Sequence, residues 1–169
     1  MNLARTYSLR EASQVVRYHT VQTIGRQTVA EHSYHVAMLV LRFTDGNASQ
    51  ELLKAVLYHD LPEVETGDLP ATFKWANLGV VQALNRVEEA FDEKYGTSVT
   101  LTDEERLILK AADILELVEY CIDQMNLGNR NMRIIAFRGL AYAKSLPFVN
   151  CHVEDFIHEL ELTIAKDFS

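Results

Sequence analysis

Two histidines and two aspartates lie on segments whose other residues have the apolar spacing of buried helices. His59 and Asp60 are adjacent at the end of one such segment, and His32 and Asp113 lie on two others. Imidazole and carboxylate groups are costly to bury unless hydrogen bonds or a cation compensate them, and both are ligands of divalent ions. One interpretation is therefore a site for Co, Zn, Mn, Ni or Mg. The alternative is two hydrogen-bonded core histidines beside a helix-terminal acid.

Two more acids follow closely after this pair. Glu63 and Asp68 both lie within nine positions of His59, and Pro62 and Gly67 interrupt the backbone between them. Proline and glycine break regular structure, so the chain can turn here and bring the acids towards one point. Such a group of carboxylates suits general acid–base chemistry, whereas the alternative is a pair of solvated loop acids.

Composition limits the classes of function. The chain has 169 residues, 48% of them hydrophobic and 24% charged, which is typical of one globular domain spanning 1–169. A net charge of −8 argues against binding a nucleic acid polymer. The longest uninterrupted apolar run, Val36 to Leu41, is far shorter than the about 20 residues of a membrane span. Cys121 and Cys151 form no CxxC motif, so we expect buried thiols in a cytoplasmic protein.

The patterns predict an all-α fold of six or seven helices, because no alternation typical of strands exceeds four residues. Thr28 with Glu31 and Thr102 with Glu105 have the form of capping boxes, and Ser49 is a third N-cap. The expected helices span about 8–17, 28–43, 49–60, 80–94, 102–125, 131–144 and 153–166. A loop is expected at 18–27.

The order His32, His59-Asp60, Asp113 resembles the H…HD…D pattern of the HD-domain phosphohydrolases. The likeness spans roughly residues 5 to 145, and it extends beyond these four positions. Further matching segments resemble the bacterial 5′-deoxynucleotidase branch and its compact phage relatives that hydrolyse dATP: Arg17-Tyr18, Thr28 to Ser33, and Tyr58 to Pro70. The resemblance implies a single HD-domain helical bundle that hydrolyses deoxynucleotides by attack of water at the α-phosphorus of a dNMP or a dNTP.

The resemblance also implies roles for individual residues. The H…HD…D set would hold a divalent ion, which activates water and polarises a phosphoryl oxygen. Glu63 and Asp68 would position that water or transfer a proton to the leaving group. Arg17 matches an arginine near the phosphate, and Lys74 resembles a second phosphate contact, although each is also a typical surface cation.

Tyr18 departs from the family pattern. The deoxynucleotidases have tryptophan there, close to the sugar, where it excludes a ribose 2′-hydroxyl. A tyrosine can also block that space, but its phenol can hydrogen-bond a sugar hydroxyl. His19 follows directly and could reach the substrate from the same loop.

Two other functions use the same metal ligands. One is hydrolysis of cyclic nucleotides or (p)ppGpp, which the Glu63…Asp68 pair fits less well, and the other is a non-catalytic nucleotide or metal sensor. The resemblance implies a small deoxynucleotide as ligand, a cytoplasmic location and a homo-oligomer, either a dimer or an assembly of dimers. Apolar residues of the C-terminal helices are the expected interface: Phe137, Phe148, Phe156 and Ile157.

Overall fold

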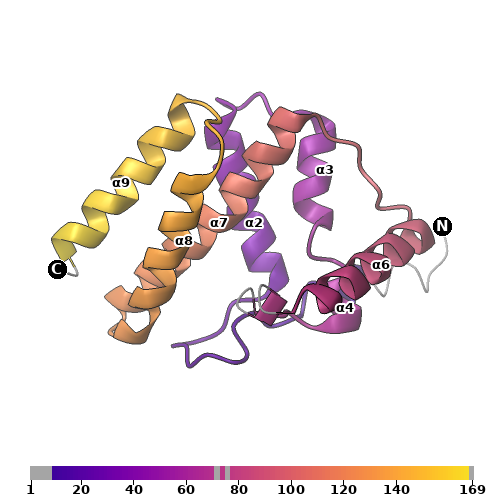
Figure 1. Cartoon of the computed structure of the whole chain (residues 1–169), viewed down its shortest axis with the longest axis horizontal. Helices are drawn as coiled ribbons and strands as arrows, with labels where there is room; N and C mark the ends of the chain where they lie inside the picture. The colour runs from indigo at the N-terminus through magenta and orange to yellow at the C-terminus, as the bar shows by residue number, and fades with distance from the viewer. Residues whose placement is uncertain (1–8, 71–72, 75–76, 168–169) are drawn as a thin grey trace. The chain divides into compact units, whose positions relative to one another are not determined.

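The computed structural model describes residues 9–70, 73–74 and 77–167, and within them the chain is helical (Figure 1). Its elements are α2 (Val29–Phe43), α3 (Gln50–Tyr58), α4 (Glu63–Thr66), α6 (Leu78–Tyr95), α7 (Asp103–Asn126), the 3₁₀ turn η1 (Arg130–Met132), α8 (Arg133–Ser145) and α9 (Cys151–Asp167). The described residues contain no strand, only an isolated antiparallel bridge between Val16 and Thr28. The prediction of an all-α fold is confirmed.

The predicted N-caps are confirmed by their hydrogen bonds. The Thr28 amide donates to Glu31 Oε2 at 2.7 Å, and the Glu31 amide donates to Thr28 Oγ1 at 3.3 Å. Thr102 and Glu105 form the same reciprocal pair at the start of α7. Ser49 Oγ accepts the Leu52 amide at 3.0 Å. Since these bonds satisfy amides that a helix start otherwise leaves unpaired, the caps fix where α2, α3 and α7 begin.

The helix predicted over 8–17 is wrong in its second half. Ser8 lies outside the described residues; helix extends over 9–12, and a turn follows at 13–14. The chain then pairs with a later segment, because the Val29 amide donates to Val15 O and the Arg17 amide to Gln27 O, both at 2.9 Å. The second half of this segment is therefore extended and pairs with the chain just before α2, although its apolar spacing is that of a helix.

The chain divides into two compact units. Unit 1 comprises Met1–Ser33 and Leu57–Thr100, and unit 2 comprises Tyr34–Val56 and Leu101–Ser169. Two of the three boundaries fall inside α2 and α3, and the third lies between the end of α6 and the start of α7. That the chain forms one domain stays a prediction.

In unit 2, α7 packs along α8, and α9 packs against both (Figure 1). Phe156 and Ile157, expected at an interface, are instead buried in this core, while Phe137 and Phe148 are exposed. Cys121 is buried as expected, but Cys151, expected to be buried, is exposed at the start of α9.

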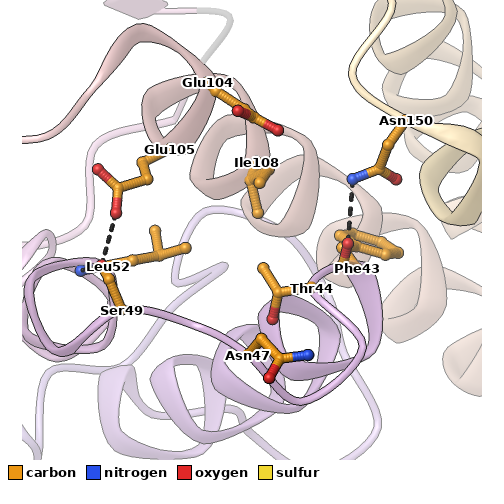
Figure 2. A pocket seen from close by; sticks show the side chains of 9 residues that line it. All are labelled: Phe43, Thr44, Asn47, Ser49, Leu52, Glu104, Glu105, Ile108 and Asn150. Atoms are coloured by element: carbon orange, nitrogen blue, oxygen red, sulfur yellow. Dashed lines mark hydrogen bonds between the residues drawn. The ribbon is translucent and has the colours of Figure 1, made fainter.

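A cavity of about 290 Å³ lies in unit 2 beside the end of α2 and the start of α7 (Figure 2). Polar side chains on its wall link helix ends: Ser49 Oγ donates to Glu105 Oε1 at 2.5 Å, and Asn150 Nδ2 donates to Phe43 O at 3.0 Å. These polar side chains therefore form hydrogen bonds at the ends of helices. Among the described residues, no helix combines the length and the apolar character needed to cross a bilayer.

Candidate functional site

The residues that resemble catalytic groups are presented by a series of tight turns in unit 1. α3 ends at Tyr58, and the next residues form successive turns in which the Leu61 amide donates to Tyr58 O and the Glu63 amide to Asp60 O, both at 3.1 Å. Pro62, whose fixed φ suits a helix start, precedes the single-turn helix α4. This local chemistry places His59, Asp60 and Glu63 on one short connection.

Two imidazoles and one carboxylate converge in unit 1. His32 is fully buried in the first turn of α2, and its Nε2 lies 3.3 Å from Nε2 of His59. Asp60 Oδ2 is 3.4 Å from His32 Nε2, and Asp60 Oδ1 is 3.5 Å from His59 Nε2. Ligand atoms that each lie about 2.0–2.1 Å from one ion are about 3.3 Å apart in tetrahedral coordination. The donor types and their separations therefore fit a single divalent cation.

Arg17 is attached directly to this cluster. Its Nη1 donates to Asp60 Oδ2 at 2.8 Å, and the residue is only 9% exposed. The main-chain bond from Arg17 to Gln27 holds its backbone, so that the side chain reaches Asp60 from the segment before α2. A guanidinium has five donors, which allows it to bind a carboxylate and a phosphate together.

The carboxyl group of Glu63, next to the cluster, has a strongly raised pKa. Its pKa is raised to about 8, chiefly by burial and then by the negative charges of Asp60 and Asp68, while Arg17 and Lys74 oppose the shift. Its Oε2 is buried and has no hydrogen-bond partner among the described residues. A carboxyl group whose pKa is near neutral pH can donate a proton in its neutral form and accept one in its ionised form.

Asp68 contacts the loop that precedes α2. The chain leaves α4 through Gly67, whose φ of 71° is readily adopted by glycine, and Asp68 follows directly. Asp68 Oδ2 accepts the main-chain amide of Tyr18 at 2.9 Å. The structure thus brings together two residues that are 50 positions apart in sequence.

A small cavity of about 30 Å³ lies beside these groups, enough for a water molecule. His59, Asp60, Glu63 and Lys74 line it, as do residues that sequence reasoning did not select, Leu84 and Glu88 among them. Both lie on α6, where Glu88 is one of several acids in a polar amphipathic pattern, so no local signal distinguished it.

His19 and Asp113 are among the predicted site residues that do not line the cavity. His19 is exposed in the loop after Tyr18. Asp113 is partly buried on α7 in unit 2, where Lys110 Nζ lies 3.5 Å from its Oδ2. Their roles stay predictions.

Helical architecture, paired histidines and the HD dipeptide define the class as an HD-domain phosphohydrolase. The chain belongs to the family described as 5′-deoxynucleotidase YfbR-like, which matches residues 6–160. A 5′-deoxynucleotidase of Enterobacter sp. (strain 638) is 28% identical, with 72% of this chain and 73% of that protein aligned. One from Photobacterium profundum is 23% identical over 92% of this chain and 93% of that protein.

Solved structures of similar fold come from a phage and an archaeon. The HD phosphohydrolase DatZ of cyanophage S-2L, bound to dA and one catalytic Zn²⁺ ion, has a TM-score of 0.71 and 23% identity, covering 98% of this chain and 99% of DatZ. Protein PH0347 of Pyrococcus horikoshii OT3 has a TM-score of 0.70 and 18% identity, covering 96% and 99%. These likenesses concern the fold. Family membership confirms the predicted class, an enzyme that hydrolyses deoxynucleotides.

Proposed function

We propose that this chain is a metal-dependent 5′-deoxynucleotidase that converts deoxynucleoside monophosphates to deoxynucleosides and inorganic phosphate. The observation that carries the proposal is the convergence of His32, His59 and Asp60, with 3.3 Å between the two imidazole nitrogens, next to the buried carboxyl of Glu63. The names of the relatives favour monophosphates as substrates.

The proposed ligands are the two imidazoles and Asp60 of unit 1, with Asp113 of α7 as the fourth. A divalent ion in this position supplies positive charge that polarises a phosphoryl oxygen and lowers the pKa of nearby water. His32 is fully buried, so it contributes a nitrogen that bulk water does not compete for.

Proton transfer is assigned to the two acids after the HD pair. Water attacks phosphorus, the bond from phosphorus to the 5′-oxygen breaks, and the deoxynucleoside leaves as an alcohol. One proton must leave the water and one must reach the 5′-oxygen. Glu63 is suited to this exchange because it lines the cavity beside His59 and Asp60 and its Oε2 is buried. Asp68 is the second proposed acid–base group.

We assign binding of the phosphate to Arg17 and Lys74, and contact with the sugar to the loop that follows Arg17. Arg17 binds Asp60 and Lys74 lines the cavity beside Glu63, and both are proposed to bind the phosphate. Tyr18 and His19 are proposed to contact the sugar side. A homo-oligomeric state, as a dimer or an assembly of dimers, and a cytoplasmic location are part of the proposal.

A second candidate is a dNTP triphosphohydrolase, in which the same attack at the α-phosphorus releases triphosphate. Two sequence features favour it, because they resemble the phage dATP triphosphohydrolases: the short chain without long insertions and the run Arg17-Tyr18-His19-Thr20.

The test is product chromatography after incubation with dAMP, dATP and AMP in Co²⁺, Mn²⁺, Zn²⁺ or Mg²⁺. We expect phosphate and deoxyadenosine from dAMP, whereas triphosphate from dATP would support the second candidate. Glu63→Ala should retain nucleotide binding and lose turnover by about 100-fold or more, the usual contribution of a general acid or base. Glu65→Ala is the matched control, because Glu65 is exposed on the same turn. Binding without turnover of any substrate in the natural chain would indicate a sensor and refute the enzyme.

A further inference from the structure

The cavity of about 290 Å³ in unit 2 has no part in the proposed function (Figure 2). It lies where the end of α2 meets the starts of α3, α7 and α9, and the residues that line it all belong to unit 2. A water molecule needs about 30 Å³, whereas pockets for small ligands begin at about 300 Å³. The cavity is therefore large enough for a small organic molecule.

The walls of the cavity combine apolar and acidic side chains. Phe43, Leu52 and Ile108 form its apolar part, and all three are buried. The carboxylates of Glu104 and Glu105 lie around the same opening (Figure 2). Of the described residues that line the cavity, only these two glutamates are charged. The charge that faces a ligand is therefore negative.

The helix starts around the cavity do not favour an anion. Their amides are already bound by caps: Ser49 Oγ accepts the Leu52 amide at 3.0 Å, Asn150 Oδ1 accepts the Val153 amide at 3.1 Å, and a capping box closes the start of α7. Each helix start carries about half a positive charge, and the end of α2 carries about half a negative one. Three starts together therefore do not offset that end and two full carboxylate charges.

The two glutamates differ in their partners. Glu105 Oε1 accepts a hydrogen bond from Ser49 Oγ and Oε2 accepts one from Thr102 Oγ1, and these bonds lower the pKa of Glu105, which keeps its carboxylate ionised. Glu104 is exposed and forms no ion pair with any described residue. Within the described part of the chain, neither glutamate belongs to a group of three metal-binding side chains, so a bare metal ion is not the expected ligand.

We propose that this cavity binds a small aliphatic amine with one or two ammonium groups. The ammonium group donates hydrogen bonds to the carboxylates of Glu104 and Glu105, and the methylene chain covers the apolar wall. An ammonium ion has three donors and no acceptor, which suits a wall of carboxylate oxygens. Hydrogen bonds between ionised partners are about twice as strong as neutral ones. The inference does not depend on the proposed function.

The test is titration calorimetry of the full chain after removal of metal by a chelator. The probes are 1,4-diaminobutane and 1-aminobutane at low ionic strength, where charges are least screened. We expect saturable binding of one amine per chain, and no detectable binding of inorganic phosphate or of 1,4-butanediol, which has the same carbon chain without the charges. Glu104→Gln should weaken binding of the diamine about five- to tenfold, because a charge-assisted hydrogen bond becomes a neutral one.

Asp103→Asn is the matched control. It removes the same charge from the same turn of α7, but Asp103 does not line the cavity. We expect it to change the dissociation constant less than about twofold, since the side chain is exposed to solvent. Asp103 and Glu104 are both exposed, so both variants should fold, and circular dichroism checks this.

Equal weakening by Glu104→Gln and Asp103→Asn would overturn the proposal, because the amine would then respond only to net charge. Absence of saturable binding of either amine at millimolar concentrations would overturn it too. So would binding of phosphate or 1,4-butanediol as tight as that of the diamine, since the site would then not select a cation.

Discussion

Replacing His59 by alanine should remove most of the thermal stability that a divalent ion confers. A ligand that binds only the folded chain stabilises it by about 2.7 kcal/mol at a concentration 100 times its dissociation constant. For a chain of this size each kcal/mol raises Tm by about 2–4 °C, so the natural chain should gain about 5–10 °C. His59 supplies one of two ring nitrogens that are 3.3 Å apart, so its loss leaves the ion without a principal donor.

The size of the loss follows from the binding equilibrium. Removal of groups that merely support metal ligands weakens binding by about 10–100-fold, so we take about 100-fold as a minimum for a ligand itself. At the same ion concentration the variant would then be half saturated and gain only about 0.4 kcal/mol, or 1–2 °C. The measurement is a thermal scan of chelator-stripped protein with and without Zn²⁺ or Mn²⁺.

The matched control is His158→Ala, because His158 is an exposed histidine on α9. It should keep the full shift. If His59→Ala gained as many degrees as the natural chain, the assignment of His59 as a ligand would be wrong, whatever the enzyme's activity.

Two further predictions concern the stability of the fold. Gly139→Ala should destabilise the chain by about 1–3 kcal/mol in urea unfolding, because the new Cβ would lie 2.9 Å from side-chain atoms of Leu117 and Val118; Gly79→Ala, with nothing within 4 Å, should not destabilise it. Glu119→Gln should stabilise the chain by about 1–2 kcal/mol at pH 8 and hardly at pH 4, a difference read from urea unfolding at each pH. Burial, and then the charges of nearby acids, raise the pKa of Glu119 to about 7. The folded state therefore favours the neutral carboxyl group and loses stability as pH rises from 4.5 through 7. An equal gain in the free energy of unfolding at both pH values would contradict this reasoning.

Local signals were sufficient where a structure depends on residues close in sequence. The capping boxes at Thr28 and Thr102 involve side chains three positions apart, so the sequence shows both partners of each bond. That His32 and His59 would meet followed instead from the resemblance to the H…HD…D family, because helical spacing alone does not bring separate segments together; their Nε2 atoms are 3.3 Å apart.

Distant main-chain contacts could not be predicted in this way. The extended pair of Val16 with Thr28 replaced the expected end of a helix, since helical periodicity describes one segment and not its partner. The positive φ of Tyr18 depends on an acid 50 positions later, and α4 is a single turn, too short to show any period. The same reason explains Glu88, whose place beside the cavity depends on how α6 packs within unit 1.

The cap at Thr28 has a consequence for His32, which lies within the first turn of α2. Terminal turns of helices unwind and re-form most often, and their amides exchange fastest with solvent. A cap contributes about 1 kcal/mol, so without it this turn would be open roughly fivefold more often, and the imidazole would leave its place each time. With His32 as a proposed ligand, we therefore expect the capping residue Thr28 to affect how long a bound ion stays in place.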